Sequence, residues 1–151
     1  MKRRDFIRNG VFMAALMSSG KVLATEHREE GSASKATELL RLHNRENPTV
    51  MEQKHVPGIE APERVKAGEW FDVAVKVGFM KEHPSKPEHW ITWIKLLVNG
   101  REVARTEYKV GGVSWSHATF KIKLQETSTI EAVEHCNLHG TWIGEPFTIT
   151  V

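Results

Sequence analysis

Cysteine is almost absent from the sequence, in which Cys136 is the only one among 151 residues. A disulfide within the chain is therefore excluded, and with it the small exported scaffolds that disulfides hold together. A cysteine without a partner in its own chain needs another explanation. Apolar residues make up 40% and charged residues 26% of the chain, which is typical of a single compact globular domain.

Long hydrophobic runs are lacking as well. The apolar run near the N-terminus, residues 10–17, is far shorter than the roughly 20 residues that a membrane-spanning helix needs. It lies between a basic segment at residues 2–8 and the small-residue exit Val22-Leu23-Ala24, an order that is typical of a secretory signal. The paired arginines of the basic segment resemble the twin-arginine export signal. We therefore expect residues 1–24 to be a cleaved export signal rather than an uncleaved membrane anchor, and the protein to be periplasmic or otherwise exported.

A strongly basic mature protein is not expected either. Residues 1–24 contain five basic side chains and one acidic side chain, so their removal changes the formal net charge from +2 to −2. No stripe of Lys and Arg remains that would argue for nucleic acid as a partner, and no further apolar segment could span a membrane. Homo-oligomers are compatible with all of these features.

The chain after the expected signal divides into two parts. Residues 25–50 are polar and rich in charge, and we expect them to form a surface extension. Ser34 is a candidate cap for one short helix in this extension, which contains Leu39, Leu40 and Leu42 and ends near Asn44. Residues 51–151 form the expected functional domain.

The apolar pattern from Trp70 onward predicts β-strands. Val73, Val75 and Val77 alternate with other residues, as a strand with one buried face requires. Further strand candidates are residues 90–98, 101–110, 118–125, 130–134 and 147–151. Asn99-Gly100 is the dipeptide that a type I′ hairpin turn favours. Short strands with Gly and Pro between them, and no convincing long helix, predict an all-β, antiparallel β-sandwich.

Three motifs contain the residues with metal-binding chemistry. A single histidine is more often a surface residue than a ligand, so spacing must decide. Cys136 and His139 are three residues apart at the end of a predicted strand, which lets a thiolate and an imidazole reach one metal ion from a tight loop. His83 and His89 lie in a loop whose two prolines limit its freedom. His55 lies further upstream, followed by Val-Pro.

Together these motifs resemble the superoxide reductases, that is, the neelaredoxins and the iron-binding domain of the desulfoferrodoxins. The family pattern is Glu-Lys-His-x-Pro, His-Pro with Pro-Glu-His, and Cys-Asn-x-His-Gly, and the resemblance covers about residues 51–151. It implies an immunoglobulin-like sandwich of about seven strands that binds one iron (Fe2+/Fe3+) per chain. The implied ligands are four equatorial imidazoles and one axial thiolate: His55, His83, His89, His139 and Cys136.

The resemblance also implies an activity, the one-electron reduction of superoxide to hydrogen peroxide. Lys54 occupies the position of the cation that attracts superoxide in the family. Because no cysteine precedes Cys136, the chain is similar to the one-iron, neelaredoxin type, and we expect an external one-electron donor protein. The clear departure is Gln53, which stands where the family usually has a glutamate that binds ferric iron. Glu52 lies one position earlier, and in an extended segment it would point to the opposite face.

Two other classes of protein fit parts of the pattern. A cupredoxin-like copper carrier is also a β-sandwich with Cys and His in one late loop, but no Met follows His139 as the usual weak axial ligand. A binding module related to the sulfur-oxidation carrier proteins would leave the histidines unexplained. His27, His43, His117 and His135 match no family ligand, and of the five tryptophans only Trp142 is expected near the site.

Overall fold

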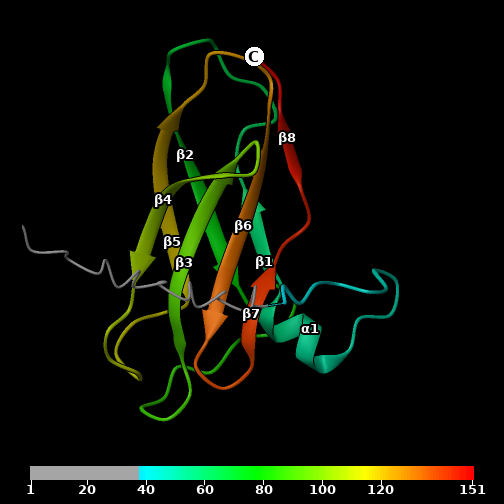
Figure 1. Cartoon of the computed structure of the whole chain (residues 1–151), viewed down its shortest axis with the longest axis vertical. Helices are drawn as coiled ribbons and strands as arrows, with labels where there is room; N and C mark the ends of the chain where they lie inside the picture. Colours follow the sequence, from blue (N-terminus) through cyan, green and yellow to red (C-terminus); the bar gives the residue numbers. More distant parts are fainter. Residues whose placement is uncertain (1–37) are drawn as a thin grey trace, which may run out of the picture. The chain divides into compact units, whose positions relative to one another are not determined.

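The computed structural model describes residues 38–151, and within them the chain forms two antiparallel β-sheets and one short helix (Figure 1). The smaller sheet has the order β1-β2-β5 and the larger one β4-β3-β6-β7, with β8 also paired to β6. The strands are β1 (Pro57–Glu60), β2 (Trp70–Val77), β3 (Ile91–Val98), β4 (Arg101–Glu107), β5 (His117–Lys123), β6 (Ser128–Cys136), β7 (Gly140–Ile143) and β8 (Phe147–Ile149). The predicted all-β sandwich is therefore confirmed, with eight strands in place of about seven. The expected export signal lies outside the described residues.

The core lies between the two sheets. Alternate residues of β2, among them Val73 and Val75, face inward and are fully buried. The larger sheet contributes residues such as Ile94, Leu96 and Ile130, which are completely buried. The period of two in the sequence therefore reflects one buried face on each sheet.

The hairpin between β3 and β4 follows the predicted turn chemistry. Asn99 has φ 49° and Gly100 has φ 77°, and a type I′ turn requires positive φ at both positions. The Asn99 side chain also accepts a hydrogen bond from the Thr129 amide at 2.9 Å, which ties the turn to β6.

The helix expected near residues 34–44 is not found in its described part. Residues 38–44 are not helical, because Leu40 instead forms a β-bridge with Trp142 of β7. The single helix of the described chain is α1 (Val50–His55), which begins after Thr49. Thr49 and Glu52 form a capping box, a pattern of a hydroxyl residue with Glu three positions later that is visible in the sequence.

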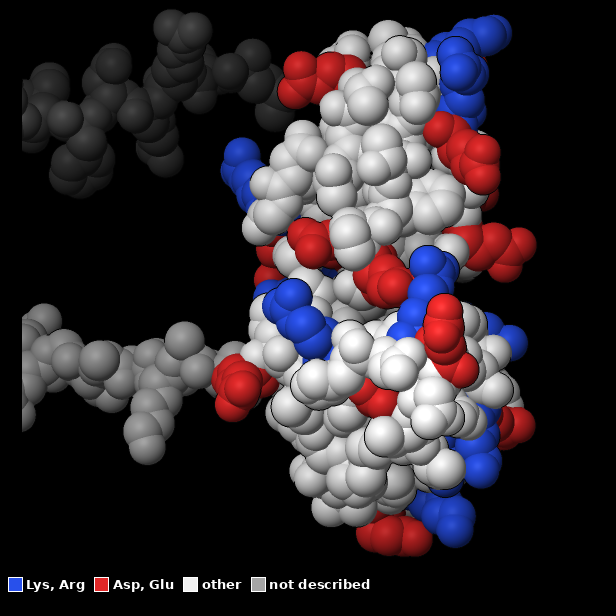
Figure 2. All heavy atoms as spheres, turned by 90° about the vertical axis from the view of Figure 1, so that its right-hand side faces the viewer, with Lys and Arg blue, Asp and Glu red and all other residues white. Residues whose placement is uncertain are grey.

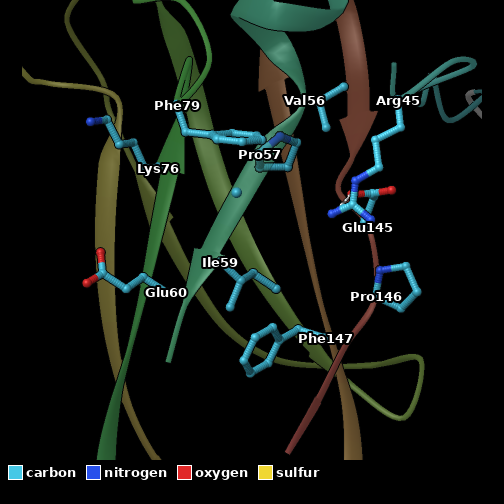
Figure 3. Close-up of a pocket in the computed structure, with 11 residues that line it drawn as sticks. Arg45, Val56, Pro57, Ile59, Glu60, Lys76, Phe79, Glu145, Pro146 and Phe147 are labelled. Carbon is cyan, nitrogen blue, oxygen red and sulfur yellow. Dashed lines mark ion pairs between the residues drawn. The ribbon is translucent and has the colours of Figure 1, made fainter. Parts of the chain in front are cut away.

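Most of the loops that contain the candidate site residues meet at one end of the sandwich. In Figure 1 this end, at the bottom, contains α1, the loop between β2 and β3, and the β6–β7 turn. A separate groove of about 580 Å³ runs beside β1 (Figure 3), and neither a histidine nor a cysteine lines it. On the face that Figure 2 shows, Lys and Arg side chains are interspersed with Asp and Glu. No helix of residues 38–151 is long and apolar enough to cross a membrane.

Candidate metal centre

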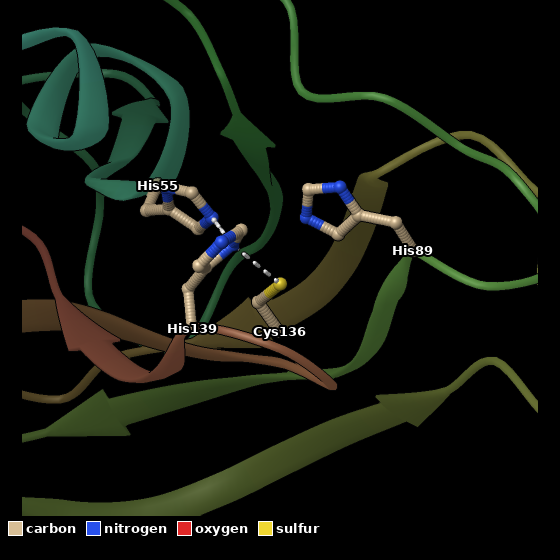
Figure 4. Close-up of side chains that lie close together, drawn as sticks. All are labelled: His55, His89, Cys136 and His139. Atoms are coloured by element: carbon tan, nitrogen blue, oxygen red, sulfur yellow. Dashed lines mark hydrogen bonds between the residues drawn. The ribbon is translucent and has the colours of Figure 1, made fainter.

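Four of the five predicted ligands converge on one point. His55, His89, Cys136 and His139 each offer one donor atom, and these atoms all lie within 4.8 Å of one another (Figure 4). They come from the end of α1, the loop before β3, the end of β6 and the β6–β7 turn. Such a group of nitrogen and sulfur atoms has the composition of a site for a borderline or soft metal ion.

His55 is oriented by its own helix. Its Nδ1 lies 2.8 Å from the Met51 carbonyl, four residues earlier, and therefore donates a hydrogen bond to it. This bond leaves Nε2 without a proton and directed into the site, the arrangement that metal-binding histidines commonly show. Nε2 faces His139 Nδ1 at 3.1 Å, a contact that a shared cation or a single proton would satisfy.

The β6–β7 turn positions Cys136 and His139. Cys136 is the last residue of β6 and fully buried, and its Sγ lies 3.5 Å from His139 Nδ1. Trp142 Nε1 donates a hydrogen bond to the His139 carbonyl at 3.0 Å, and the Trp142 ring stacks on His55 at a centroid distance of 5.2 Å. Trp142 therefore contacts the site, as its position after the motif led us to expect.

Asn137 connects this turn to the loop of His89. Its Oδ1 accepts a hydrogen bond from the Trp90 amide, and its Nδ2 donates to the Glu88 carbonyl, both at 2.9 Å. The two bonds bracket His89, so a single side chain fixes the position of that histidine relative to Cys136. We did not identify this residue from the sequence, although it lies inside the Cys-Asn-x-His-Gly motif. Its partners are 47 and 49 residues away in the chain.

His83 lies beside the four converging donors. Its ring centroid lies 4.8 Å from that of His55 and 4.7 Å from that of His89. The ring centroid of His139 lies at the same two distances from those of His55 and His89. The four imidazoles thus form a closed ring, with 6.4 Å between His55 and His89 across it. His83 is 3% exposed, and neither of its nitrogens has a hydrogen-bond partner within residues 38–151, nor has Nε2 of His89. Buried polar atoms without partners are rare, and a metal ion would satisfy them.

Gly78 lets the chain pass close to His83. Its φ is 75°, and a Cβ added there would lie 2.5 Å from the His83 backbone nitrogen and 2.8 Å from the Lys81 carbonyl oxygen. Only glycine fits a left-handed backbone at such a distance without strain. The chain therefore turns sharply after β2, and His83 lies beside the rings of His55 and His89.

Burial favours the neutral form of three of the imidazoles. Burial is the main cause that lowers the pKa of His55 to about 4 and of His83 to about 3, and burial also lowers the pKa of His89. At neutral pH these rings therefore have a free lone pair, as a metal ligand needs. Burial raises the pKa of the Cys136 thiol, whereas hydrogen bonds from the Leu138 and His139 amides lower it.

Lys54 places a positive charge next to this ring of imidazoles. It precedes His55 in the last turn of α1, is partly exposed, and forms no ion pair with any residue of the described chain. Its charge contributes to lowering the pKa of both His55 and His89. The ammonium group therefore acts on the histidines of two different elements.

The segment before His55 differs from its expected form. We expected an extended chain, in which Glu52 and His55 would point to opposite faces, but the segment is helical and both residues are buried. Glu52 nevertheless does not face the metal centre, because its carboxylate accepts hydrogen bonds from Thr49 and His43. The Gln53 side chain donates to the Pro48 carbonyl at 2.9 Å.

The histidines that match no ligand lie elsewhere, as far as the structure describes them. The His135 ring stacks on Trp93 of β3 with centroids 5.6 Å apart, and His117 accepts a hydrogen bond from Trp115 Nε1 at 2.7 Å. His43 pairs with Glu52, and His27 is outside the described residues. Glu134, two residues before Cys136, is fully buried without a hydrogen-bond partner in residues 38–151, and burial raises its pKa well above its usual range.

The fold and the site together define a class: a β-sandwich with a mononuclear, non-haem metal centre of imidazole and thiolate donors. Comparison with known proteins identifies the family within that class. The desulfoferrodoxin family model matches residues 47–145, and the chain belongs to this family.

Named relatives share most of their length with this chain. A superoxide reductase of Thermococcus kodakarensis is 35% identical in a 102-residue alignment that covers 62% of this chain and 85% of that protein. The neelaredoxin of Megalodesulfovibrio gigas is 32% identical in a 107-residue alignment that covers 60% of this chain and 82% of that protein. The solved structure of a superoxide reductase (neelaredoxin) from Ignicoccus hospitalis superposes with a TM-score of 0.65 at 32% identity, covering 75% of this chain and 94% of that one.

Proposed function

We propose that this protein is a superoxide reductase, an oxidoreductase that converts superoxide to hydrogen peroxide at one non-haem iron. The observation that carries this function is the convergence of His55, His89, Cys136 and His139 at one end of a sandwich of the desulfoferrodoxin family. Relatives named superoxide reductase and neelaredoxin are similar to this chain in sequence, and one solved structure with such a name is also similar to it in fold.

The proposed ligand set adds His83 to these four residues. Its support is the closed ring of four imidazoles and the two buried nitrogens of His83 that lack a partner in the described chain. Four imidazoles and one thiolate suit iron, which accepts both nitrogen and sulfur donors. A bound cation would also favour the thiolate form of Cys136 over the thiol that burial alone favours.

Iron held by these residues would supply the one electron with which superoxide and two protons become hydrogen peroxide. The role of Lys54 in this reaction is to attract the anion, because an uncompensated cation beside the site raises the local concentration of a negative substrate. Cys136 contributes a thiolate, the strongest electron donor of the set, and its burial keeps water away from the sulfur. Met51, Asn137 and Trp142 hold the ligands in place through the contacts described above.

The electron that restores the ferrous state must come from outside the chain. The sequence holds one cysteine, which the metal centre uses, and residues 38–151 contain no second cluster of metal donors. We therefore propose an external one-electron donor protein as a partner.

The copper alternative is not favoured. A cupredoxin site uses two imidazoles with one cysteine, whereas four imidazole rings surround this one. The sequence has no Met after His139 that could serve as the weak axial ligand.

Metal analysis of the purified protein, together with its electron paramagnetic resonance spectrum, tests the function. We expect one iron per chain with a high-spin ferric signal, and peroxide formed from superoxide at the expense of an added electron donor. Stoichiometric copper, the absence of metal, or release of dioxygen from superoxide without use of the donor would each refute the proposal.

We further propose export by the twin-arginine route, supported by Arg3-Arg4, the short apolar run and Ala24 in the sequence. Export of a folded protein would let the iron enter before the membrane is crossed. Replacing both arginines by lysine should retain the precursor in the cytoplasm. Unchanged export of this variant would contradict the route.

A further inference from the structure

The helix that contains His55 is too short to be stable by itself. α1 has six residues, whereas isolated helices need about 12–15 residues to be even marginally stable in water. Its orientation must therefore come from contacts with other parts of the chain. Met51 lies in the first turn of α1, and its carbonyl orients the His55 ring. Contacts that hold this first turn therefore also affect the orientation of His55.

A single buried carboxylate holds that first turn. Glu52 is 5% exposed, and its Oε2 accepts hydrogen bonds from the amide and the hydroxyl of Thr49, both at 2.7 Å. Its Oε1 accepts the His43 amide at 2.8 Å and lies 3.0 Å from His43 Nδ1. These bonds lower the pKa of Glu52 to about 2, so the carboxylate is charged at neutral pH. All donors in this cluster precede α1 in the sequence.

His43 belongs to a segment that also contacts the other side of the site. This segment, residues 39–46, is called the strap here, and it lies before the region that the family model matches. The Leu40 amide donates to the Thr141 carbonyl and the Leu40 carbonyl accepts from the Ile143 amide, both at 2.9 Å. Arg45 forms an ion pair with Glu145 at 3.2 Å (Figure 3). The strap is thus attached both to α1, which ends at His55, and to β7, which follows His139.

We propose that Glu52 and His43 are positioning residues for the metal centre, which hold the first turn of α1 and thereby the Met51 carbonyl that orients His55. This inference rests on the ligand set proposed above. The route is short: the carboxylate fixes the turn, the turn fixes the carbonyl, and the carbonyl fixes the ring tautomer and direction. Neither residue belongs to the proposed ligand set, so the effect on the site is indirect.

The test compares two Glu→Gln variants of the whole protein. Glu52→Gln keeps the shape but replaces one acceptor oxygen by a donor group that cannot accept from Thr49 or His43. Glu102→Gln is the matched control, because the Glu102 carboxylate accepts two hydrogen bonds from Arg105, and these bonds lower its pKa to about 2. Glu102 lies near the start of β4, just after the Asn99-Gly100 turn that ends β3. His89 precedes β3, so Glu102 and the candidate metal centre are at opposite ends of that strand.

Two readouts separate positioning from general stability. The first is the rate at which iron-loaded protein releases Fe2+ to an excess of a chromogenic chelator, under conditions in which circular dichroism shows each variant folded. Loss of a group that orients a ligand typically weakens metal binding 10–100-fold, so we expect Glu52→Gln to release iron about ten-fold faster than wild type. The second is hydrogen exchange of the Val56 amide, which donates to the Glu52 carbonyl at 2.9 Å and should exchange faster in this variant.

The outcomes are distinct. Fe2+ release from Glu102→Gln should match wild type, and His43→Ala, which removes one bond to the carboxylate, should show a smaller increase than Glu52→Gln. If Glu52→Gln does not fold, His43→Ala decides the question. Equal release from wild type and Glu52→Gln, or the same increase in both Glu→Gln variants, would overturn the inference. Wild-type protein that binds no iron would instead refute the proposed function.

Discussion

Substitution of Gly78 by Ala tests how the close approach at the end of β2 positions His83. Gly78 has φ 75°, and a left-handed backbone costs a residue with a Cβ about 1–2 kcal/mol. The new Cβ would also lie 2.5 Å from the His83 backbone nitrogen, and overpacking of this kind costs about 1–3 kcal/mol more. We therefore expect Gly78→Ala to lower the free energy of unfolding by about 2–5 kcal/mol and to displace His83 from the other imidazoles.

The chain offers a matched control for this substitution. Gly100 has φ 77°, and nothing lies within 4 Å of a Cβ added there, so Gly100→Ala has the backbone cost of about 1–2 kcal/mol alone. Urea unfolding of the metal-free proteins measures both losses, and iron content after loading reports on the site. Gly78→Ala should lose stability and iron, whereas Gly100→Ala should lose only stability. Equal losses in unfolding free energy, with full iron content in both variants, would refute the role given to Gly78 and weaken the case for His83 as a ligand.

The remaining predictions concern the chemistry of the site. Cys136→Ser should lose the thiolate-to-iron charge-transfer absorption and most superoxide reduction, because oxygen donates less electron density to iron than sulfur; a coloured, fully active variant would contradict the axial assignment. Lys54→Ala should slow the reaction with superoxide about ten-fold and flatten its dependence on ionic strength, because steering is a screened long-range effect. Lys54→Arg should keep both properties, and an unchanged rate and salt dependence in Lys54→Ala would make Lys54 an ordinary surface residue. Ferric wild type should bind azide more readily than its Gln53→Glu variant; a carboxylate-ligated ferric spectrum in wild type that Glu52→Ala removes would show that Glu52 is the ligand.

The sequence predicted those parts of the fold that depend on a local period. Strand β2 runs over Trp70–Val77 because its alternation is regular, and the Asn99-Gly100 turn has positive φ at both residues. Strands β1 and β7 have four residues each, too few for a period of two to stand out. The leucines of residues 39–42 suggested a helix, but Leu40 instead forms a β-bridge with Trp142 of β7. Trp142 lies 102 residues further along the chain, so no local pattern reveals this contact, which overrides the local helix propensity.

The candidate site divides in the same way. Its candidate ligands form short motifs, so their chemistry can be read locally, and the donor atoms of four of them lie within 4.8 Å of one another. The contacts that hold them are long-range: Asn137 reaches Glu88 and Trp90, and Trp142 stacks on His55. These pairings depend on how the sheets bring loops together, and only the folded chain shows them.

The helical form of residues 50–55 changes how the missing glutamate should be understood. Glu52 and His55 are three residues apart, so in α1 they share a buried face, and distance along the helix does not keep the Glu52 carboxylate from the metal centre. What keeps it away is its set of four donors from Thr49 and His43, which it would have to give up in order to bind a metal. If the carboxylate bound a metal instead, these hydrogen bonds would break. Each buried donor or acceptor left without a partner would then destabilise the protein. Its negative charge is also offset locally by the N-terminus of α1, where backbone amides converge. The Glu52 carboxylate is therefore occupied at the start of the helix and forms no ion pair with Lys54 near its end, whose charge acts on both His55 and His89.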